Sequence, residues 1–558
     1  MGIDIKDSLS PAYAPRTISS HSIDMVILQE WLRKCLEKHS GWCLPIRRNH
    51  LPGFRLLDCR SRCLVNAPAD CQYVALSYLW GQDHDGAFDM SALPKTIEDG
   101  ITVTLLMGYH FLWIDRYCID QSDPEQKHDQ ISNMDQVFSG ADLVIVAAAG
   151  EDPHYGLPGV STRARKPQSI IETESFKLVQ MFPYAKQVLG RTRWATRAWT
   201  FQEGYLAKRR LIFTDRQAIF VCGEGYYTET FSSPIAHYAC QPDLSLAGYF
   251  LARDTIYPDR CIEEYTARFM SFESDALDAF QGVLNYWSNS TEIQGVPLNI
   301  FVGSRHHTHI WGVTTDGSWL NLGWCHKQTT RRRQGFPSWS WTGWHGPVKF
   351  GDLTYKKQLV RKEIGSVRAS PPISKEKTES SDSMLWMSLH IYRDNFDEKF
   401  FARHDTLRFL KISGPSPRVR FIRRSLTEWL ALIPATNSRH SISCDVDWDV
   451  DWDDKDMRRR DVNSCVAMMV EGDARPMKSA TSVQAQTGTI TIQSSKSGQN
   501  DKIRGWFLLM LPMPTGGTYE RVGKMWVDGA RSFRPDEVHI DGERWEEPLW
   551  SKRTIILA

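Results

Sequence analysis

The sequence has no long apolar run, no excess of charge of either sign and no CxxC cysteine pair. A helix that crosses a bilayer needs roughly 18–20 consecutive apolar residues. No segment approaches this length, so we expect no membrane span. Lys and Arg (67) almost balance Asp and Glu (66). This balance gives no global electrostatic reason to expect nucleic acid as a partner.

The sequence also lacks a regular cysteine spacing, a leader and several well-known catalytic motifs, and these absences exclude some classes of protein. The 12 cysteines have no short, regular spacing, and no cationic and then apolar leader opens the sequence. Both features are typical of reduced thiols in a cytosolic or nuclear protein, and we expect a cytoplasmic location. The sequence also lacks a Walker glycine loop, a GxGxxG motif and a GxSxG motif. Their absence argues against ordinary NTPases, Rossmann dehydrogenases and esterases.

Tryptophan, by contrast, is abundant, with 21 residues. Several of them lie in the segment FPSWSWTGWHG at 336–346. A buried indole needs a partner for its N–H group, so this cluster predicts a specific packing site.

The chain is long enough for several domains, because 558 residues correspond to about two to four domains of ordinary size. We divide it into a helical or extended lead-in at 1–69, an α/β domain at 70–225 and a mixed, β-rich region at 226–558. Within the last region, 366–383 and 478–502 are rich in Ser, Thr, Lys and Gln, and we predict disordered loops there.

The 70–225 segment alternates between two kinds of pattern. Strand-like apolar runs alternate with helix-like runs, in the order 72–81, 93–108, 110–115, 122–140 and 141–150. Strands that alternate with helices pair in parallel through right-handed crossovers, which predicts an α/β sheet with helices on both faces. The segment ends with a predicted helix and a predicted hairpin, at 193–209, 210–214 and 218–222.

Local signals predict the nature of other segments. Apolar residues at helical spacing predict an amphipathic helix over 23–38, after a loose leader at 1–20. Ser122 and Glu125 have capping-box spacing, which predicts the start of the 122–140 helix. The run DVDWDVDWDD at 445–454 lacks the glycine of a calcium loop and is predicted to be a solvated acidic segment.

The most interesting polar residues follow the predicted strands. Ligands of an open parallel sheet bind beyond the carboxyl ends of its strands, where helix N-termini also point. This rule selects the residues after the strands and at the start of the last helix: Trp80, Gly81, Asp115, Asp120, Gln121, Arg197, Trp199, Gln202 and Glu203. Carboxylates beside a guanidinium can be held ionised by it or can share an anionic ligand with it. A salt-bridge network that fixes the loops would use the same residues, and the sequence leaves both interpretations open.

The stretch RAWTFQE at 197–203 contains four of the selected residues, Arg197, Trp199, Gln202 and Glu203. Trp199 lies three residues before Gln202 and four before Glu203, so a helix would place the three side chains on one face.

A metal site is a separate possibility. Cys35, His39 and Cys43 are spaced by four residues and would suit three zinc ligands, with Cys59 or Cys63 as a fourth. However, the chain has no CxxC pair, and Cys35 lies on the apolar face of its predicted helix, where core thiols are common. We therefore predict no metal or other cofactor, and the sequence leaves open whether these residues bind an ion.

Four motifs, in order and at intact spacing, resemble those of the fungal HET (heterokaryon incompatibility) domain. They are YVALSYLWG at 73–81, LWIDRYCIDQ at 112–121, QISNMDQVFSGADLVIVAAAG at 130–150 and RAWTFQE at 197–203. The second motif departs from the usual pattern at Arg116 and Tyr117, where a small and then an aliphatic residue are more common.

The resemblance implies a role in fungal non-self recognition and programmed cell death, through protein partners or self-assembly. HET domains are thought to be related in fold to TIR domains, which implies a TIR-like, flavodoxin-like sheet. Some TIR domains cleave NAD⁺ with a glutamate, so an alternative is that the chain is an NAD⁺ glycohydrolase. Glu203 would then be catalytic together with Asp115. Trp80 or Trp199 would stack on the base and Arg197 would hold phosphate, with NAD⁺ as substrate rather than cofactor.

Overall fold

The computed structural model describes residues 2–4, 15–47, 51–81, 92–174, 177–180, 182, 185–231, 235–236, 258–288, 324–326, 328, 330–333, 336, 338, 340–350, 388–390, 410–417, 419–423, 428–434, 441–455, 457–473, 504–514, 517–528 and 550–557. The chain forms two compact units, Met1–Cys261 with Ala267–Gly295 and Ile262–Thr266 with Val296–Ala558. The first unit extends beyond the predicted 70–225 domain on both sides.

A nine-stranded sheet forms the centre of the first unit. Its strands are, in sheet order, β12 (Ile235–Ala236), β11 (Gly225–Thr228), β10 (Ala218–Cys222), β9 (Arg209–Phe213), β6 (Leu143–Ala147), β4 (Tyr73–Ser77), β5 (Phe111–Ile114), β2 (Arg55–Asp58) and β3 (Cys63–Asn66). The four central strands β9, β6, β4 and β5 are parallel. The strands at both edges pair antiparallel, so the sheet is mixed. The predicted hairpin is confirmed as β9 and β10.

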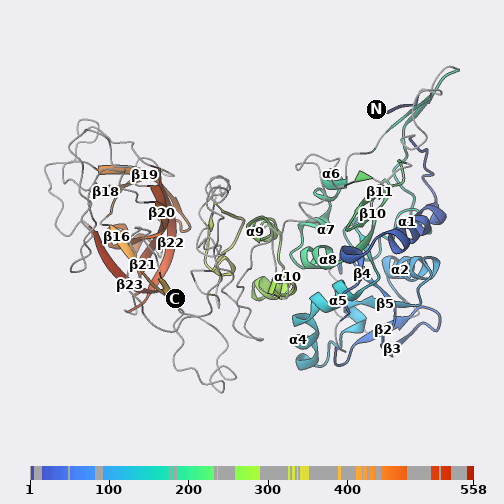
Figure 1. Cartoon of the computed structure of the whole chain (residues 1–558), viewed down its shortest axis with the longest axis horizontal. Helices are drawn as coiled ribbons and strands as arrows, with labels where there is room; N and C mark the ends of the chain where they lie inside the picture. Colours follow the sequence, from blue (N-terminus) through green and yellow to red (C-terminus); the bar gives the residue numbers. More distant parts are fainter. Residues whose placement is uncertain are drawn as a thin grey trace, which may run out of the picture. The chain divides into compact units, whose positions relative to one another are not determined.

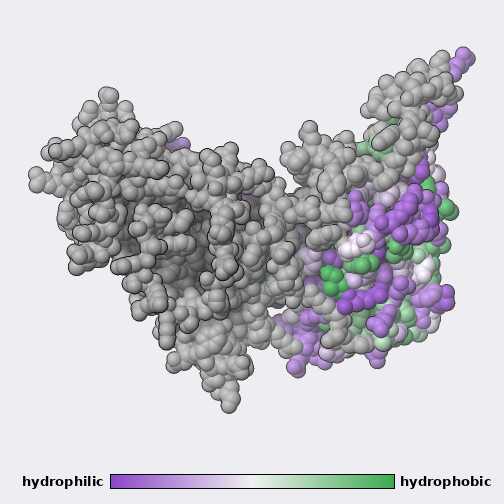
Figure 2. Space-filling view, in the orientation of Figure 1, coloured by the Kyte–Doolittle hydropathy of each residue, from purple (hydrophilic) through white to green (hydrophobic). Residues whose placement is uncertain are grey.

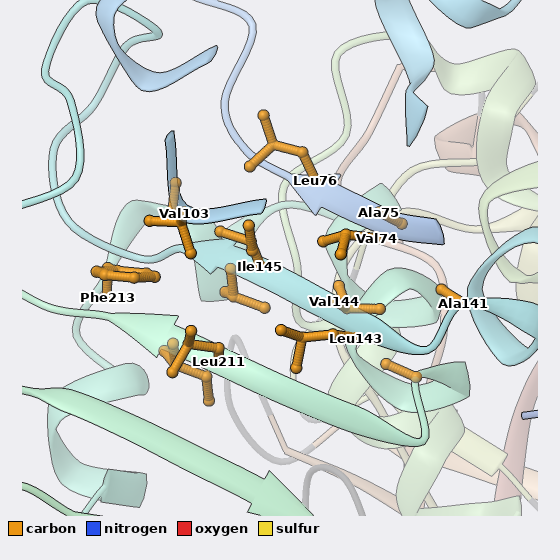
Figure 3. Packing of buried hydrophobic residues seen from close by; sticks show 14 of the residues in the cluster. Val74, Ala75, Leu76, Val103, Ala141, Leu143, Val144, Ile145, Leu211 and Phe213 are labelled. Atoms are coloured by element: carbon orange, nitrogen blue, oxygen red, sulfur yellow. The ribbon is translucent and has the colours of Figure 1, made fainter. Parts of the chain in front are cut away.

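The centre of this sheet is buried on both faces. Every residue of β4, β6 and β9 is buried, and Figure 3 shows Val74, Leu143 and Leu211 among the apolar side chains packed there. Continuous apolar runs are expected of parallel strands that are covered on both sides. Burial of each large aliphatic side chain contributes about 1.5–3 kcal/mol, so the central strands form the stable part of the unit.

Helices cover the two faces of the sheet (Figure 1). The helices α1 (Met25–Lys38) and α2 (Lys95–Leu106) lie on one face, and α5 (Met134–Gly140) and α8 (Trp199–Leu206) lie on the other. Successive residues of a strand point to opposite faces. Leu76 accordingly packs under Gly100 of α2, whereas Ser77 contacts α8.

The amphipathic helix predicted at 23–38 is confirmed as α1. It begins after Asp24, whose side chain caps the helix by accepting a hydrogen bond from the Val26 N–H at 3.0 Å. Its buried residues include Leu28 and Trp31, which belong to the same core as the central strands. The lead-in also supplies β2 and β3, so it is built into the sheet.

The pattern at 122–140 forms two helices rather than one. They are α4 (Pro124–Ser132) and α5, and they meet at Asn133. The predicted cap at Ser122 is wrong, because Asp123 accepts hydrogen bonds from the backbone N–H groups of Glu125 and Gln126. Asp123 directly precedes a proline at the first helical position, and its charge favours the helix N-terminus.

The stretch predicted as one helix at 193–209 is also broken. It forms α7 (Arg193–Thr196) and α8, and Arg197 between them has an extended backbone with φ −88° and ψ 142°. Arg197 forms a bridge with Phe269, and the Ala198 N–H donates to the Phe269 carbonyl at 2.9 Å. Backbone pairing with a distant segment therefore overrides the local helical tendency.

The prediction of a loose leader at 1–20 is wrong at its start. Strand β1 (Gly2–Asp4) pairs antiparallel with β8 (Lys177–Val179), which in turn pairs with β7 (Ile170–Glu172). The segment between β6 and α6 thus provides a strand partner for the leader. The remaining helices of the first unit are η2 (Gly41–Cys43), α3 (Asp115–Cys118), α6 (Ala185–Leu189), η5 (Glu273–Ala276) and α10 (Asp278–Ser288).

The second unit contains a further nine-stranded sheet. Seven of its strands lie in the order β15 (Ser388–His390), β16 (Leu410–Pro417), β23 (Trp550–Leu557), β22 (Tyr519–Asp528), β19 (Ser441–Trp448), β18 (Trp429–Pro434) and β17 (Arg420–Arg423). The other two branch from this path: β21 (Arg504–Pro512) pairs with β22, and β20 (Val466–Asp473) pairs with β21. The other elements are α9 (Pro258–Thr266), which spans the unit boundary, β13 (Trp324–His326), β14 (Val348–Phe350), η6 (Trp341–Gly343), η7 (Met457–Arg459) and η8 (Val462–Ser464). The loops predicted at 366–383 and 478–502 lie outside the described residues.

The acidic run at 445–454 is not simply solvated. Asp449 is fully buried, where its Oδ2 accepts a hydrogen bond from Arg521 Nε at 2.9 Å and its Oδ1 lies 3.0 Å from His326 Nδ1. The prediction is wrong at this residue because the run continues strand β19 into the core. The tryptophan cluster does form a packing site, since the buried Trp344 donates its indole N–H to the Ser338 carbonyl at 2.7 Å.

The surface of the first unit has both hydrophilic and hydrophobic areas. Figure 2 shows large hydrophilic areas (purple) on the face in view, with smaller hydrophobic areas between them. Among the described residues, no helix combines the length and the apolar composition that crossing a membrane requires.

Candidate functional site at the carboxyl ends of the central strands

The first unit brings two acidic residues together near the carboxyl ends of β4 and β5. Asp115 directly follows β5, and Glu203 lies in α8. The two groups interact, because the negative charge of Asp115 raises the pKa of Glu203. Residues 88 positions apart in the sequence (203 − 115) therefore share one electrostatic environment.

Glu203 is buried, with only 5% of its surface exposed. Ser77, the last residue of β4, donates a hydrogen bond to the Glu203 carboxyl group, and Trp194 Nε1 donates to the Ser77 hydroxyl at 2.7 Å. Burial, together with the charge of Asp115, raises the pKa of Glu203 to about 8, against the lowering effects of Ser77 and Arg197. Glu203 is therefore mostly protonated at pH 7.

Asp115 is partly buried and has two hydrogen bonds to its carboxylate. Trp80 Nε1 donates to Oδ2 at 2.7 Å, and the backbone N–H of Arg116 donates to Oδ1 at 2.7 Å. Burial raises the pKa of Asp115 to about 6, although these hydrogen bonds and the charge of Arg197 oppose the rise. Asp115 is therefore mostly ionised at pH 7, and the pair carries one acid and one base.

Arg197 supplies positive charge to this pair. Its guanidinium lowers the pKa of both Asp115 and Glu203, so it lies near both. The side chain is partly exposed, and within the described part of the chain its guanidinium has no hydrogen bond or ion pair. Arg268 holds the backbone around Arg197 in place. Its Nη1 donates to the Arg197 carbonyl at 3.1 Å and to Thr200 Oγ1 at 3.3 Å. Arg197 thus has donors available for an anionic ligand.

Tyr78 also lies near the cluster and was not selected from the sequence. Its hydroxyl is buried and has no hydrogen-bond partner among the residues that the structure describes. Burial raises the pKa of Tyr78 well above its usual range, and the charges of Asp115 and Glu203 add to the rise. A buried hydroxyl without a partner is unusual and is a candidate to bind a ligand.

Ser77 and Trp194 are further residues that sequence reasoning missed. One signal was available for Ser77, because it is the polar residue of a strand that is otherwise buried and apolar. A polar group in such a position requires a partner. Nothing in the sequence indicated that this partner would be Glu203.

Arg116, one of the two departures from the family pattern, is buried beside the site. Its guanidinium carbon lies 6.0 Å from the ring centres of both Trp80 and Tyr117. Arg116 therefore packs between the ring of Tyr117 and that of Trp80, the residue that donates to Asp115.

Trp199 and Gln202 do not share the surroundings of Glu203. Trp199 Nε1 donates to Asp275 Oδ2 at 3.0 Å, and Gln202 Oε1 accepts from the Gly282 N–H at 3.1 Å. Both side chains contact the 273–288 segment, whereas Glu203 contacts the sheet. The three residues do lie in one helix as expected, but their side chains contact different elements, because α8 packs between β4 and α10.

The remaining predicted residues stabilise loops. Asp120 accepts hydrogen bonds from the Ser122 N–H at 3.0 Å and from its hydroxyl at 2.6 Å. The side chain of Gln121 donates to the Asp115 carbonyl at 3.5 Å. Gly81 has φ +76°, and a Cβ there would lie 2.8 Å from Pro153 Cδ, so only glycine fits this turn.

The fold and the site together define an α/β domain with a buried acidic cluster at the carboxyl ends of its central strands. Residues 73–203 match the family model described as Heterokaryon incompatibility protein (HET). The match begins at the first residue of β4 and ends at Glu203. The family match thus covers the stretch that carries the four motifs resembling a HET domain, from β4 to α8. No curated protein and no solved structure matches it significantly.

Proposed function

We propose that this protein takes part in fungal non-self recognition and programmed cell death through its HET domain. The observation that carries the proposal is the family match at 73–203, because the same stretch supplies Ser77, Asp115 and Glu203 to one cluster. Burying carboxyl groups costs free energy, and perturbed carboxyl groups gather more often at functional sites than elsewhere. In this proposal the protein acts in the cytoplasm, with protein partners or with copies of itself.

A TIR-like fold for the HET domain is part of the same proposal. The four parallel strands lie in the order β5, β4, β6 and β9, so the first strand in the chain lies between the second and the third. Flavodoxin-like sheets have this strand order. The antiparallel strands at both edges are additions to that arrangement.

A second candidate function is NAD⁺ glycohydrolase activity as the cause of death. Protonated Glu203 beside ionised Asp115 favours it, because two carboxyl groups with separated pKa values can act as different partners in one reaction. A cationic nicotinamide ring near Glu203 would favour ionisation of its carboxyl group, and the proton would pass to solvent as the substrate binds. The resulting carboxylate would stabilise the oxocarbenium-like ribosyl centre as nicotinamide leaves with the electrons of the glycosidic bond.

Other residues have roles in this second candidate. Ionised Asp115 accepts a proton from the water that attacks the ribosyl carbon, and Arg197 holds phosphate. Trp80 is the better candidate for stacking on the base, because it contacts Asp115 directly. Trp199 donates to Asp275 instead.

The two functions are separable by experiment. The full chain would be expressed from an inducible promoter in fungal cells as wild type, Glu203→Gln, Asp115→Asn and Glu37→Gln, the last as an exposed control. We expect wild type and Glu37→Gln to arrest growth, and the two site variants to lose this effect while the purified proteins melt as cooperatively as wild type. Growth arrest by a folded Glu203→Gln variant would contradict a role of the cluster in killing.

Incubation of the same purified proteins with NAD⁺, followed by chromatography for nicotinamide, tests the chemistry. Nicotinamide release by wild type and not by Glu203→Gln supports the glycohydrolase. Killing without any release by the wild-type protein would exclude the glycohydrolase and leave the first proposal standing.

A further inference from the structure

Away from the acidic cluster, three cysteines and a histidine meet. Cys35 lies in α1, His39 follows its last residue, Cys43 ends η2 and Cys222 ends β10. One ligand atom from each residue lies within 4.8 Å of all the others. The three cysteines are buried and the histidine is partly buried.

Cys222 occupies the place that the sequence suggested for Cys59 or Cys63. Cys59 Sγ instead lies 3.9 Å from the Leu57 carbonyl, and the exposed Cys63 contacts the Ser61 carbonyl at 3.4 Å. The suggestion was wrong because Cys222 is far from the other three in the sequence, 183 residues from His39.

The distances within this group fit a tetrahedral zinc site. Zn–S bonds of about 2.3 Å and Zn–N bonds of about 2.0–2.1 Å place neighbouring ligand atoms about 3.5–3.8 Å apart. His39 Nδ1 lies 3.4 Å from Cys222 Sγ and 3.9 Å from Cys43 Sγ. The nitrogen that the histidine turns toward the thiols is thus at ligand distance from both.

Arg209 supplies the charge that such a site needs. A Zn²⁺ ion with three thiolates and a neutral imidazole carries a net negative charge, which is costly to bury without a counter-charge. Arg209 is 1% exposed, and its Nε–H donates to Cys35 Sγ at 3.2 Å. Its Nη1 also donates to the Asp142 carbonyl at 3.1 Å, which holds the guanidinium in place. A hydrogen bond from a buried cation is the kind of support that positions a metal-bound thiolate.

We propose that Cys35, His39, Cys43 and Cys222 bind one structural Zn²⁺ ion. Four protein ligands fill the coordination sphere and leave no position for water or substrate, which distinguishes structural from catalytic zinc. A disulfide between two of the cysteines would leave the third thiol and the histidine without a role, so the zinc site explains more of the arrangement.

The ion would connect segments that flank the family match. None of its four ligands lies within 73–203. The site ties the end of α1 to the end of β10, and so holds the lead-in helix on the sheet. Its role is therefore to stabilise the domain, independently of the acidic cluster and of the proposed function.

The first test is elemental analysis of the full chain purified under reducing conditions. We expect about one zinc per chain in wild type and in the Cys63→Ser control, whose thiol is exposed. The Cys222→Ser variant should contain at least about tenfold less zinc, because metal binding is lost with a ligand. Arg209→Met should keep the ligands but bind zinc about 10–100-fold more weakly, as judged by competition with a chelator.

His39 provides a test that does not disturb a buried thiol. The His39→Cys variant should still bind one ion, and its cobalt(II) form should show a thiolate charge-transfer spectrum shifted from that of wild type. His39→Ala should bind cobalt at least about tenfold more weakly than His39→Cys. Wild-type protein that binds neither zinc nor cobalt, or whose Cys35 and Cys222 are found joined in a disulfide after purification under reducing conditions, would overturn the proposal.

Discussion

Ser77, the last residue of β4, donates a hydrogen bond to Glu203, which lies 126 residues further along the chain. The same hydroxyl accepts a hydrogen bond from Trp194 Nε1 at 2.7 Å. This pair of bonds attaches α7 and α8 to the carboxyl end of the central strand. It also holds the Glu203 carboxyl group where Asp115 and Arg197 act on it.

The stability of the domain should depend on pH through Glu203. Its pKa is raised from the ordinary 4.5 to about 8 in the folded protein, so the folded state holds a proton that the unfolded chain releases between these values. The contribution of this bound proton to the free energy of unfolding is complete below about pH 4.5 and is lost as the pH rises through about 8. As the pH rises from about 5 to about 9, wild type loses this contribution and Glu203→Gln does not. The unfolding free energy of Glu203→Gln should therefore increase relative to that of wild type by on the order of 2–4 kcal/mol over this range.

Urea denaturation across this pH range measures the gain. The exposed Glu37→Gln variant is the control for the removal of a carboxyl group that is not buried. Parallel curves for wild type and Glu203→Gln would mean that Glu203 titrates normally.

Removing the Ser77 hydroxyl should destabilise the first unit. Ser77→Ala removes the hydroxyl that accepts from the Trp194 indole and donates to Glu203, and the loss of a buried hydrogen bond costs about 1–3 kcal/mol. Because the hydrogen bond from Ser77 lowers the pKa of Glu203, the pKa should also rise in the variant. Ser122→Ala, which removes an exposed hydroxyl, should change the unfolding free energy by less than about 0.5 kcal/mol. Equal effects of the two substitutions would argue against the importance of the Ser77 bonds.

A buried ion pair links the segment between β6 and β7 to the residue that follows β11. Arg165 Nη1 lies 2.5 Å from Glu229 Oε2, and the two side chains are 1% and 2% exposed. Arg165→Met leaves a buried carboxylate unpaired and should cost about 3–5 kcal/mol of unfolding free energy. The double variant with Glu229→Gln should recover part of this loss, and Arg33→Met, in an exposed pair, should be nearly neutral. No recovery in the double variant would show that the loss came from the packing of Arg165 and its hydrogen bonds to the Ser19 and Ser22 carbonyls, and not from charge.

In the second unit, Asp449 should contribute stability that acid removes. Contacts with Arg521 and His326 lower the pKa of Asp449 to about 2, although burial opposes this. Its contribution is present above the ordinary pKa of 3.8 and is lost as the pH falls through about 2. Asp449→Asn should therefore cost about 3–5 kcal/mol near pH 7 and progressively less in acid.

Denaturation of the full chain at several pH values checks this expectation. Asp451→Asn, at an exposed residue of the same acidic run, is the matched control and should have little effect. A cost of Asp449→Asn that is independent of pH would contradict the role of its charge.

Much of the central sheet could be predicted, because its signals are local. Continuous apolar runs predicted β4, β5 and β6, and helical spacing predicted α1 and α2. The places where prediction failed depend on distant partners. Arg197 interrupts a predicted helix because its backbone pairs with Phe269, and the leader forms β1 because β8 provides an edge for it. Competition between local and distant hydrogen bonds is invisible in a local pattern.

The sequence by itself determined the central strands β4, β5 and β6 and the helices α1 and α2, and it selected Asp115, Arg197 and Glu203 by their positions after strands and at the start of a helix. Only the tertiary structure decided that Ser77 would bond to Glu203, and that Cys222 would join Cys35. The physical reason is that periodicity records burial along one element. Contacts between elements depend on the order of strands in the sheet and on the face that each helix covers, which the packing of the whole unit decides.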